Sequence, residues 1–192
     1  MTTVATRLTL DEFLRWDDGS ESLYELENGQ LIPMPAESEV NQRIAMFLIL
    51  YLGRLGIGAN RLRRGTEIMV SSGTVGVRVP DLVILSEELA QVMQGATRSL
   101  VTLEMPPPLL VVEIVSPGQE KRDYRYKRSE YAARAIPEYW IVDPLQNKVT
   151  ILEWVEGWYE ECIFTGQENL VSPQLGTLSI TADMLLSARE EL

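Results

Sequence analysis

Two carboxylates of this chain stand in or beside apolar segments, where ionised side chains are rarely found. Glu113 interrupts the apolar run Leu109–Val115, and Asp81 comes just before the apolar run Val83–Leu85. A strand that is apolar throughout is usually buried on both faces, and an unpaired carboxylate there costs several kcal/mol. Two such acids on neighbouring strands can offset this cost by sharing a divalent cation. The pattern therefore predicts a metal site.

The predicted site has the ligand chemistry of a hard cation. Mg²⁺ and Mn²⁺ take oxygen ligands, commonly one or two carboxylates completed by water and substrate phosphate. The backbone carbonyl of Ile114 could add a protein oxygen to those of Asp81 and Glu113. The alternative is a structural ion pair between Glu113 and a lysine or arginine, and the spacing alone does not decide between the two.

A helix predicted over residues 119–134 carries a lysine on its apolar face. Four residues recur at steps of three or four and share the face expected to pack on the sheet: Tyr124, Lys127, Tyr131 and Ala135. Lys127 is the only charged member of this set, and Glu113 is its obvious partner. The alternatives are that the lysine stem extends over the apolar face towards solvent, or that the two residues form a simple salt bridge.

The charge distribution permits local phosphate binding although the whole chain is acidic. Its 192 residues include 28 Asp and Glu against 17 Lys and Arg, a formal net charge of −11, which does not favour general affinity for polyphosphates. Ten of the basic residues nevertheless fall within 54–64 and 121–134. Candidate contacts to a phosphate backbone are Arg61, Arg63, Arg64, Lys121, Arg122, Arg125 and Arg128. The alternative is that both stretches are solvated basic faces.

Composition excludes several classes of chemistry. Histidine is absent and Cys162 is the only cysteine, so Ser-His or Cys-His catalysis, His-ligated zinc and an internal disulfide are excluded. The length suits one domain spanning residues 1–192. No apolar stretch approaches a membrane span and the first residues lack a basic start followed by an apolar run, so we expect a cytoplasmic protein.

The order of predicted elements favours an α/β (α+β) fold with a mixed sheet. Helices are predicted from Thr9 to about Trp16, from about Ser38 to Gly53 or Gly56, over 119–134, and from Thr181. Strands are predicted at 23–27 and 30–34 around Asn28-Gly29, at 66–71, 77–85, 109–115 and 139–142, and in a hairpin over 148–153 and 158–164. A turn with Gly73 and Gly76 precedes the strand at 77, and residues 86–108 are expected to form an irregular insertion.

Four segments carry a resemblance to a known family. They are Pro80-Asp81, Glu113-Ile114-Val115-Ser116-Pro117, Asp123-x-x-x-Lys127-x-x-x-Tyr131, and Pro137-Glu138-Tyr139-Trp140-x-Val142-Asp143-Pro144. In this order and spacing they resemble the Uma2 family of restriction-endonuclease-like proteins, within the PD-(D/E)XK nuclease superfamily. The similarity covers nearly the whole chain from Leu8 onward. It implies a restriction-endonuclease-like core, a mixed β-sheet flanked by helices, with added hairpins at both ends.

The resemblance also implies roles for three residues. Asp81 matches the first acid of the superfamily and Glu113 matches the second. The superfamily lysine is expected two residues after the second acid, where this chain has Val115. The resemblance implies that Lys127, on the following helix, supplies the lysine instead.

The segment around the first long helix departs from the family pattern. Asn41 stands where similar proteins often carry a histidine. Glu37 or Glu39, just before that helix, could reach the metal, and the spacing selects neither.

These observations predict a homodimeric, metal-dependent endonuclease that hydrolyses DNA phosphodiester bonds with Mg²⁺ or Mn²⁺. The expected metal ligands are Asp81, Glu113 and the Ile114 carbonyl, while Lys127 orients water or offsets charge in the transition state. The alternative is a catalytically inactive nuclease-fold protein that acts as a dimeric binding or assembly module. The acidic total and Asn41 favour this second interpretation.

Overall fold

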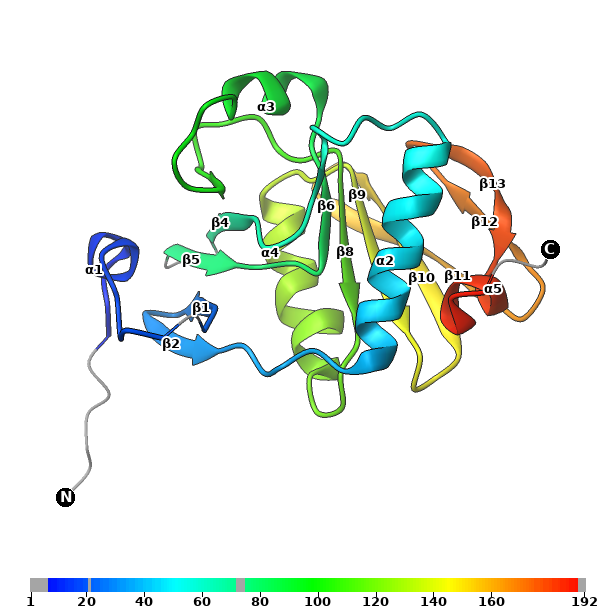
Figure 1. Cartoon of the computed structure of the whole chain (residues 1–192), viewed down its shortest axis with the longest axis horizontal. Coiled ribbons are helices and arrows are strands. Elements are labelled where there is room, and N and C mark those ends of the chain that lie inside the picture. Colours follow the sequence, from blue (N-terminus) through cyan, green and yellow to red (C-terminus); the bar gives the residue numbers. More distant parts are fainter. Residues whose placement is uncertain (1–6, 21, 72–74, 190–192) are drawn as a thin grey trace.

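A six-stranded sheet lies at the centre of the protein (Figure 1). The computed structural model describes residues 7–20, 22–71 and 75–189. The strand order is β11 (Trp158–Thr165), β10 (Lys148–Val155), β9 (Glu138–Asp143), β8 (Leu110–Ile114), β6 (Leu82–Ile84) and β3 (Leu62–Arg63). β8 and β9 are parallel, whereas the other neighbouring strands of this sheet are antiparallel. The sheet is therefore mixed, as the sequence predicts.

A second sheet of five strands stands beside the first, on the side of the N-terminus (Figure 1). Its order is β2 (Gln30–Pro33), β1 (Tyr24–Glu27), β5 (Val75–Arg78), β4 (Glu67–Ser71) and β7 (Leu100–Val101). The expected hairpin of β1 and β2 is present, and both turn residues, Asn28 and Gly29, have positive φ values of 52° and 81°. An Asn-Gly pair adopts this backbone readily, which explains the tight turn.

Helices cover both faces of the six-stranded sheet. α2 (Glu39–Arg54) and α5 (Ala182–Ser187) pack on one face, together with the hairpin of β12 (Asn169–Ser172) and β13 (Gly176–Thr181). The other face carries a π-helical turn, η1 (Arg122–Lys127), continued by α4 (Arg128–Ala133). Two short helices, α1 (Leu10–Leu14) and α3 (Glu87–Val92), lie at the periphery (Figure 1).

Local sequence signals explain where several helices begin. Thr9 and Glu12 form the predicted capping box of α1, and the side chains of Ser38 and Thr181 cap α2 and α5. These side chains satisfy backbone N–H groups that have no partner within the helix. The expected starts of these three helices are confirmed.

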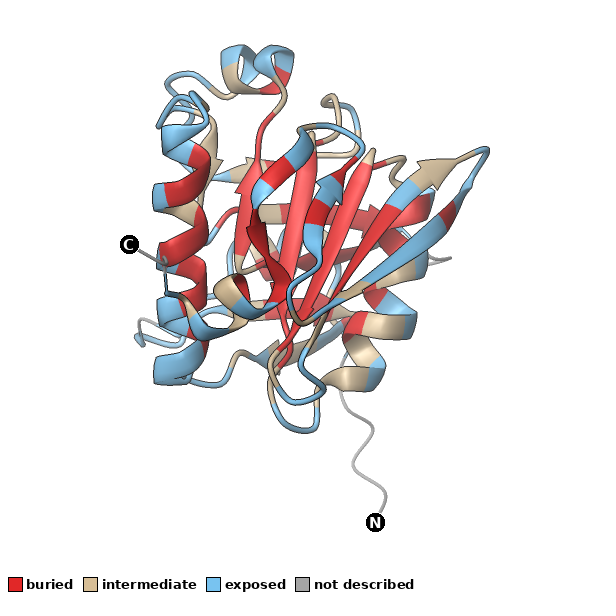
Figure 2. Ribbon diagram, turned by 90° about the vertical axis from the view of Figure 1, so that its right-hand side faces the viewer, coloured by how far each residue is buried: buried red, intermediate tan, exposed pale blue. Residues whose placement is uncertain are grey.

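The central strands are buried on both faces (Figure 2). In β8, Leu110, Val112 and Ile114 pack towards α2, whereas Val111 packs towards α4. Glu113 alternates onto the same face as Val111 and is only 3% exposed. The apolar run therefore places its single acid inside the protein, on the face of the sheet that η1 and α4 cover.

Two predictions for the middle of the chain are wrong. The strand expected over 77–85 is broken at Val79–Asp81, where the chain leaves the five-stranded sheet at β5 and enters the six-stranded sheet at β6. Pro80 has no N–H to give to a sheet ladder, which accounts for the break. The region 86–108 is not wholly irregular, because it contains α3, capped by Ser86, and β7.

Gly73 of the expected turn lies outside the described residues.

In the part of the chain that the structure describes, none of the helices has the length and apolarity needed to cross a membrane.

Candidate functional site

Two crossings between the sheets bring together segments that are distant in the sequence. The chain passes from β3 to β4 through residues 64–66, and from β5 to β6 through residues 79–81. Because β3 pairs with β6 and β4 pairs with β5, both antiparallel, these two connections run side by side. Asp81 therefore sits where the two sheets meet, next to the end of β8.

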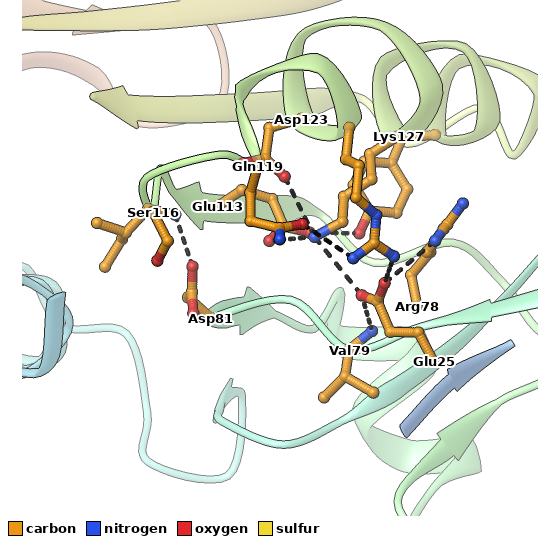
Figure 3. A network of polar contacts seen from close by, with 12 residues as sticks. Glu25, Arg78, Val79, Asp81, Glu113, Ser116, Gln119, Asp123 and Lys127 are labelled. Atoms are coloured by element: carbon orange, nitrogen blue, oxygen red, sulfur yellow. Dashed lines mark hydrogen bonds and ion pairs between the residues drawn. The ribbon is translucent and has the colours of Figure 1, made fainter. Parts of the chain in front are cut away.

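Asp81 is fixed to the neighbouring strand by its own side chain. The Ile114 backbone N–H donates to Asp81 Oδ2 over 2.6 Å (Figure 3). Burial raises the pKa of Asp81 to about 6, although this hydrogen bond and the Lys127 ammonium lower it; the carboxylates of Glu37 and Asp123 raise it further. The expected meeting of Asp81 with the Glu113-Ile114 segment is thus present.

Glu113 has a partner on each carboxylate oxygen. Tyr131 donates its hydroxyl to Oε1 over 2.7 Å, and Lys127 Nζ lies 2.8 Å from Oε2. Tyr131 and Lys127 belong to the helix face predicted to pack on the sheet. The sequence expectation that Lys127 points towards the sheet and contacts Glu113 is therefore met.

The protonation of Glu113 reflects burial among other acids. Burial raises its pKa to about 8, against the opposing effect of Lys127, and the charges of Asp123, Asp81 and Glu25 raise it further. Such a carboxyl group retains its proton more readily than one in water. An added cation would oppose this effect.

Lys127 is surrounded by three carboxylates. Its Nζ lies 2.8 Å from Glu113, 3.3 Å from Asp123 Oδ1 and 3.5 Å from Glu25 Oε1 (Figure 3). Burial alone would lower the pKa of Lys127, but these three acids raise it above its usual range. The amine is therefore held as an ammonium ion.

The turn that carries Lys127 is π-helical, which the sequence does not predict. η1 contains Asp123 and Lys127, both buried, and continues directly into α4. A π-turn inserts extra backbone into a helix and often occurs at functional sites. Here the turn contains both members of the Asp123–Lys127 ion pair.

Glu25, like Asp123, is a residue of this site that the sequence analysis missed. It lies on β1 in the N-terminal hairpin and is 1% exposed. Its carboxylate accepts from the Val79 N–H over 3.1 Å, and pairs with Arg78 Nη1 at 3.1 Å and with Arg122 (Figure 3). Burial raises its pKa, but Lys127, Arg78 and Arg122 together bring it below the ordinary value.

The fully buried Arg78 explains why Glu25 can be buried. Arg78 Nε and Nη2 donate to the two oxygens of Glu130 over 2.7 and 2.9 Å, and Nη1 lies 2.9 Å from Glu27. The only sequence signal was Tyr24-Glu25-Leu26-Glu27, in which acids alternate with apolar residues. That pattern indicates an exposed acidic face, because nothing local shows that Arg78 will cover it.

Asn41 contacts the carbonyl that was expected to bind metal. Its Nδ2 donates to the Ile114 carbonyl over 3.1 Å and to Ser116 Oγ over 3.0 Å. A carbonyl oxygen has a second lone pair, so this contact does not prevent Ile114 from binding a cation. Asn41 therefore provides an amide that joins α2 to the end of β8.

The structure separates Glu37 from Glu39. Glu37 lines the same cavity as Asp81 and pairs with Arg64. Glu39 is exposed and lies 3.7 Å from Arg43 on α2. Only Glu37 lies beside the predicted site.

A cavity of about 70 Å³ joins these groups, and Asp81, Glu113, Ile114, Asp123 and Lys127 all line it. It has room for an ion and a few water molecules. Within the described ranges, no group of three or more Asp, Glu, His or Cys side chains is arranged to hold a metal. Two carboxylates and one carbonyl remain a suitable oxygen donor set for a hard cation that keeps most of its ligands as water or phosphate.

The expected phosphate-binding residues have different surroundings. Arg122 donates to Glu25, Glu27 and Gln119, and Arg128 contacts Glu161 and the Tyr159 carbonyl. Lys121 and Arg125 are exposed, and Lys121 Nζ lies 5.6 Å from the centre of the Tyr126 ring.

The other basic stretch lies mostly along a separate cavity. Arg61 and Arg63 line a hollow of about 800 Å³ bordered by α3, and both donate to backbone carbonyls. Arg64 alone of these three reaches Asp81, through a 3.3 Å hydrogen bond from Nε to the Asp81 carbonyl.

Comparison with known proteins supports the fold and the family resemblance. The family model of Uma2, described as "Putative restriction endonuclease", matches residues 10–184. A crystal structure described as "a putative nuclease belonging to DUF820 from Anabaena variabilis ATCC 29413" is similar with a TM-score of 0.73 and 19% identity, covering 94% of this chain and 98% of that one. None of the curated proteins matches. The predicted restriction-endonuclease-like fold is confirmed.

Proposed function

The chain belongs to the Uma2 family, and we propose on this basis that it is a metal-dependent endonuclease hydrolysing DNA phosphodiester bonds. The family description supports the coarser assignment to nucleases. The observation that carries the finer proposal is the buried contact of Lys127 with Glu113 beside Asp81, at the rim of one small cavity. A wholly structural ion pair would not require the extra acids that surround it.

Asp81, Glu113 and the Ile114 carbonyl would hold the cation, Mg²⁺ or Mn²⁺. When bound, such an ion polarises a phosphoryl oxygen and lowers the pKa of a coordinated water. The hydrogen bond from the Ile114 N–H fixes one Asp81 oxygen, and Tyr131 fixes one Glu113 oxygen. These contacts orient both carboxylates before any ligand arrives.

Lys127 acts as a fixed positive charge in this proposal. Its raised pKa keeps the amine protonated, so it does not serve as a general base near neutral pH. A preorganised ammonium ion stabilises negative charge that develops on the phosphoryl group, because it need not reorganise during the reaction. Glu25 and Asp123 position the ammonium through their contacts with Nζ.

Lys121 and Arg125 are the best placed of the predicted helix residues to meet the DNA backbone, since both are exposed. Arg122 and Arg128 are already paired with acids and would contribute less. Contacts of this kind position a duplex without reading its sequence.

The proposed assembly is a homodimer, which would present two sites to the two strands of a duplex. β11 is the last strand in the order of the six-stranded sheet, and Trp158 and Ile163 on it are 79% and 51% exposed. A sheet edge with apolar side chains favours pairing with another strand. Light scattering of the purified protein, compared with Trp158→Arg, tests this: the variant should lose the dimer mass.

A plasmid-nicking assay in Mg²⁺ or Mn²⁺ tests the catalytic proposal. Asp81→Asn, Glu113→Gln and Lys127→Ala should each lower the nicking rate about 100-fold or more, because the first two remove proposed metal ligands and the third removes a charge that stabilises the transition state. Lys148→Ala and Glu160→Gln are matched controls, because neither residue lines the cavity and both should retain full activity.

Equal nicking by the wild type and the three site variants would refute the assignment. The inactive binding module is the second candidate, favoured by the net charge of −11, which opposes general affinity for DNA. Calorimetry with Mn²⁺ separates the two. Heat that disappears in Asp81→Asn supports the nuclease, whereas no heat at millimolar metal supports the binding module.

A further inference from the structure

A second cavity opens beside the candidate site. It has a volume of about 300 Å³ and shares Met34, Glu37 and Asp81 with the smaller cavity that contains Glu113. The two hollows are therefore neighbours, and the Asp81 segment forms part of both walls.

The walls of this second cavity differ from those of the first. Four of its lining residues are apolar: Leu23, Met34, Val79 and Pro80. Among the described residues, its charged lining consists of Glu37, Arg64 and Asp81, and Arg64 is the only cation. A partly apolar hollow with a guanidinium in its wall suits a ligand that is anionic on one side and apolar on the other.

The position of Arg64 is set by the crossing between the sheets. It directly follows β3 and precedes Gly65, whose φ of 66° turns the chain towards β4. Its Nε donates to the Asp81 carbonyl over 3.3 Å. The guanidinium is therefore anchored to the backbone of a predicted metal ligand.

Glu37 forms an ion pair with the Arg64 guanidinium. The ion pair joins Arg64 Nη2 to Glu37 Oε1, and the two side chains are 34% and 31% exposed. A guanidinium has five N–H donors, of which the described residues engage only Nε and Nη2 of Arg64. An exposed ion pair contributes little to stability, so an anion that binds in bidentate fashion can replace Glu37 at low cost.

We propose that Arg64 and the adjoining cavity bind a phosphate of the nucleic-acid strand beside the scissile bond, and that Glu37 competes for Arg64 until DNA binds. The apolar wall then contacts the sugar or base attached to that phosphate. This inference rests on the proposed function, because the ligand is the substrate of the same site. It assigns Glu37 to Arg64 rather than to the metal.

Binding of a fluorescein-labelled DNA duplex, followed by anisotropy in EDTA, tests the proposal without cleavage. Arg64→Ala should raise the Kd roughly tenfold, the usual effect of losing a charge-assisted contact. Arg64→Lys should fall between the wild type and Arg64→Ala because it keeps the charge but loses the bidentate geometry. Glu37→Gln should lower the Kd severalfold by releasing Arg64.

Two matched variants separate this effect from general changes in charge. Glu39→Gln removes an acid two residues away that pairs with Arg43, and Lys148→Ala removes a cation on β10 that lines neither cavity. Each should change the Kd by less than about twofold. When Arg64 is already replaced by alanine, adding Glu37→Gln should lower the Kd no more than Glu39→Gln lowers it in the wild type.

The proposal is overturned if Arg64→Ala binds DNA like the wild type, if Glu37→Gln does not tighten binding, or if neither wild type nor Glu37→Gln binds the duplex. It is also overturned if Glu37→Gln weakens Mn²⁺ binding in calorimetry, since Glu37 would then act as a metal ligand. Failure of the proposed function is a separate result, namely no nicking by the wild type with either metal.

Discussion

The two faces of the six-stranded sheet are built on different physical principles. Towards α2, the strands contribute apolar residues such as Leu110, Val112 and Trp140 to a largely apolar cluster. Towards α4, the same strands contribute apolar residues and, at one end, the buried acid Glu113, which meets Lys127 of η1. One strand, β8, supplies both faces through simple alternation.

The difference shows which part of the protein is organised for stability and which for chemistry. Apolar burial stabilises without any requirement for exact partners. Buried charges must each find a partner, and a well-packed apolar replacement is often no less stable. The buried ions around Glu113 and Lys127 therefore add little stability that apolar residues would not also provide. Their presence is consistent with a functional reason for these charges.

The largest expected effect on stability comes from replacing Arg78, which pairs with the buried acids Glu25 and Glu130. Arg78→Met should cost about 3–5 kcal/mol at pH 7.5, because Glu130 is left buried without the arginine that binds both of its oxygens and Glu25 loses one of its three cations. Lys127, Arg78 and Arg122 lower the pKa of Glu25, and Arg78 and Arg122 lower that of Glu27, so the stability these acids contribute is present above their ordinary pKa and is lost as pH falls. Urea unfolding should therefore show a smaller cost at pH 4. An equal cost at both pH values would contradict this account.

The matched change on the apolar face should behave differently. Leu48 of α2 is fully buried in the apolar cluster, and Leu48→Ala should cost about 2–4 kcal/mol through lost burial and a cavity. No charge is removed, so urea unfolding should give the same cost at pH 7.5 and pH 4. If the cost of Leu48→Ala instead depended strongly on pH, the proposed difference between the two faces of the sheet would be wrong.

The smallest expected effect is a gain in stability at Asp81. Its pKa is raised to about 6, so the folded protein favours the protonated form. Stability is therefore highest below the unfolded pKa and falls as pH rises through about 6. Asp81→Asn should stabilise the metal-free protein by about 1 kcal/mol at pH 7.5, since the group is partly accessible, and by much less at pH 4. Denaturation curves at the two pH values measure this, and a stabilisation that does not depend on pH would count against it.

Much of the architecture could be predicted because its causes are local. The capping box of Thr9 and Glu12 and the Asn28-Gly29 turn depend on residues within three or four positions of each other. The Glu113–Lys127 contact could also be predicted, since each residue is a charged member of an apolar pattern and a buried charge requires a partner. Their catalytic roles remain predictions.

Other features depend on pairings that no local pattern encodes. Glu25 enters the site because β1 pairs with β5, which brings it against Arg78, 53 positions later. The strand expected through residues 77–85 divides between two sheets, and this division places Asp81 beside Arg64.

The family could be recognised from the resemblance of four segments. The mixed sheet and the buried pair Glu113 and Lys127 could be predicted because caps and alternation act over a few residues. The contacts of Glu25 and Asp123 with the ammonium, the π-turn of the helix and the ion pair of Glu37 with Arg64 follow from the tertiary structure alone. The physical reason is that Coulomb interactions and desolvation depend on distances through space, and these are set by how the two sheets pair and cross.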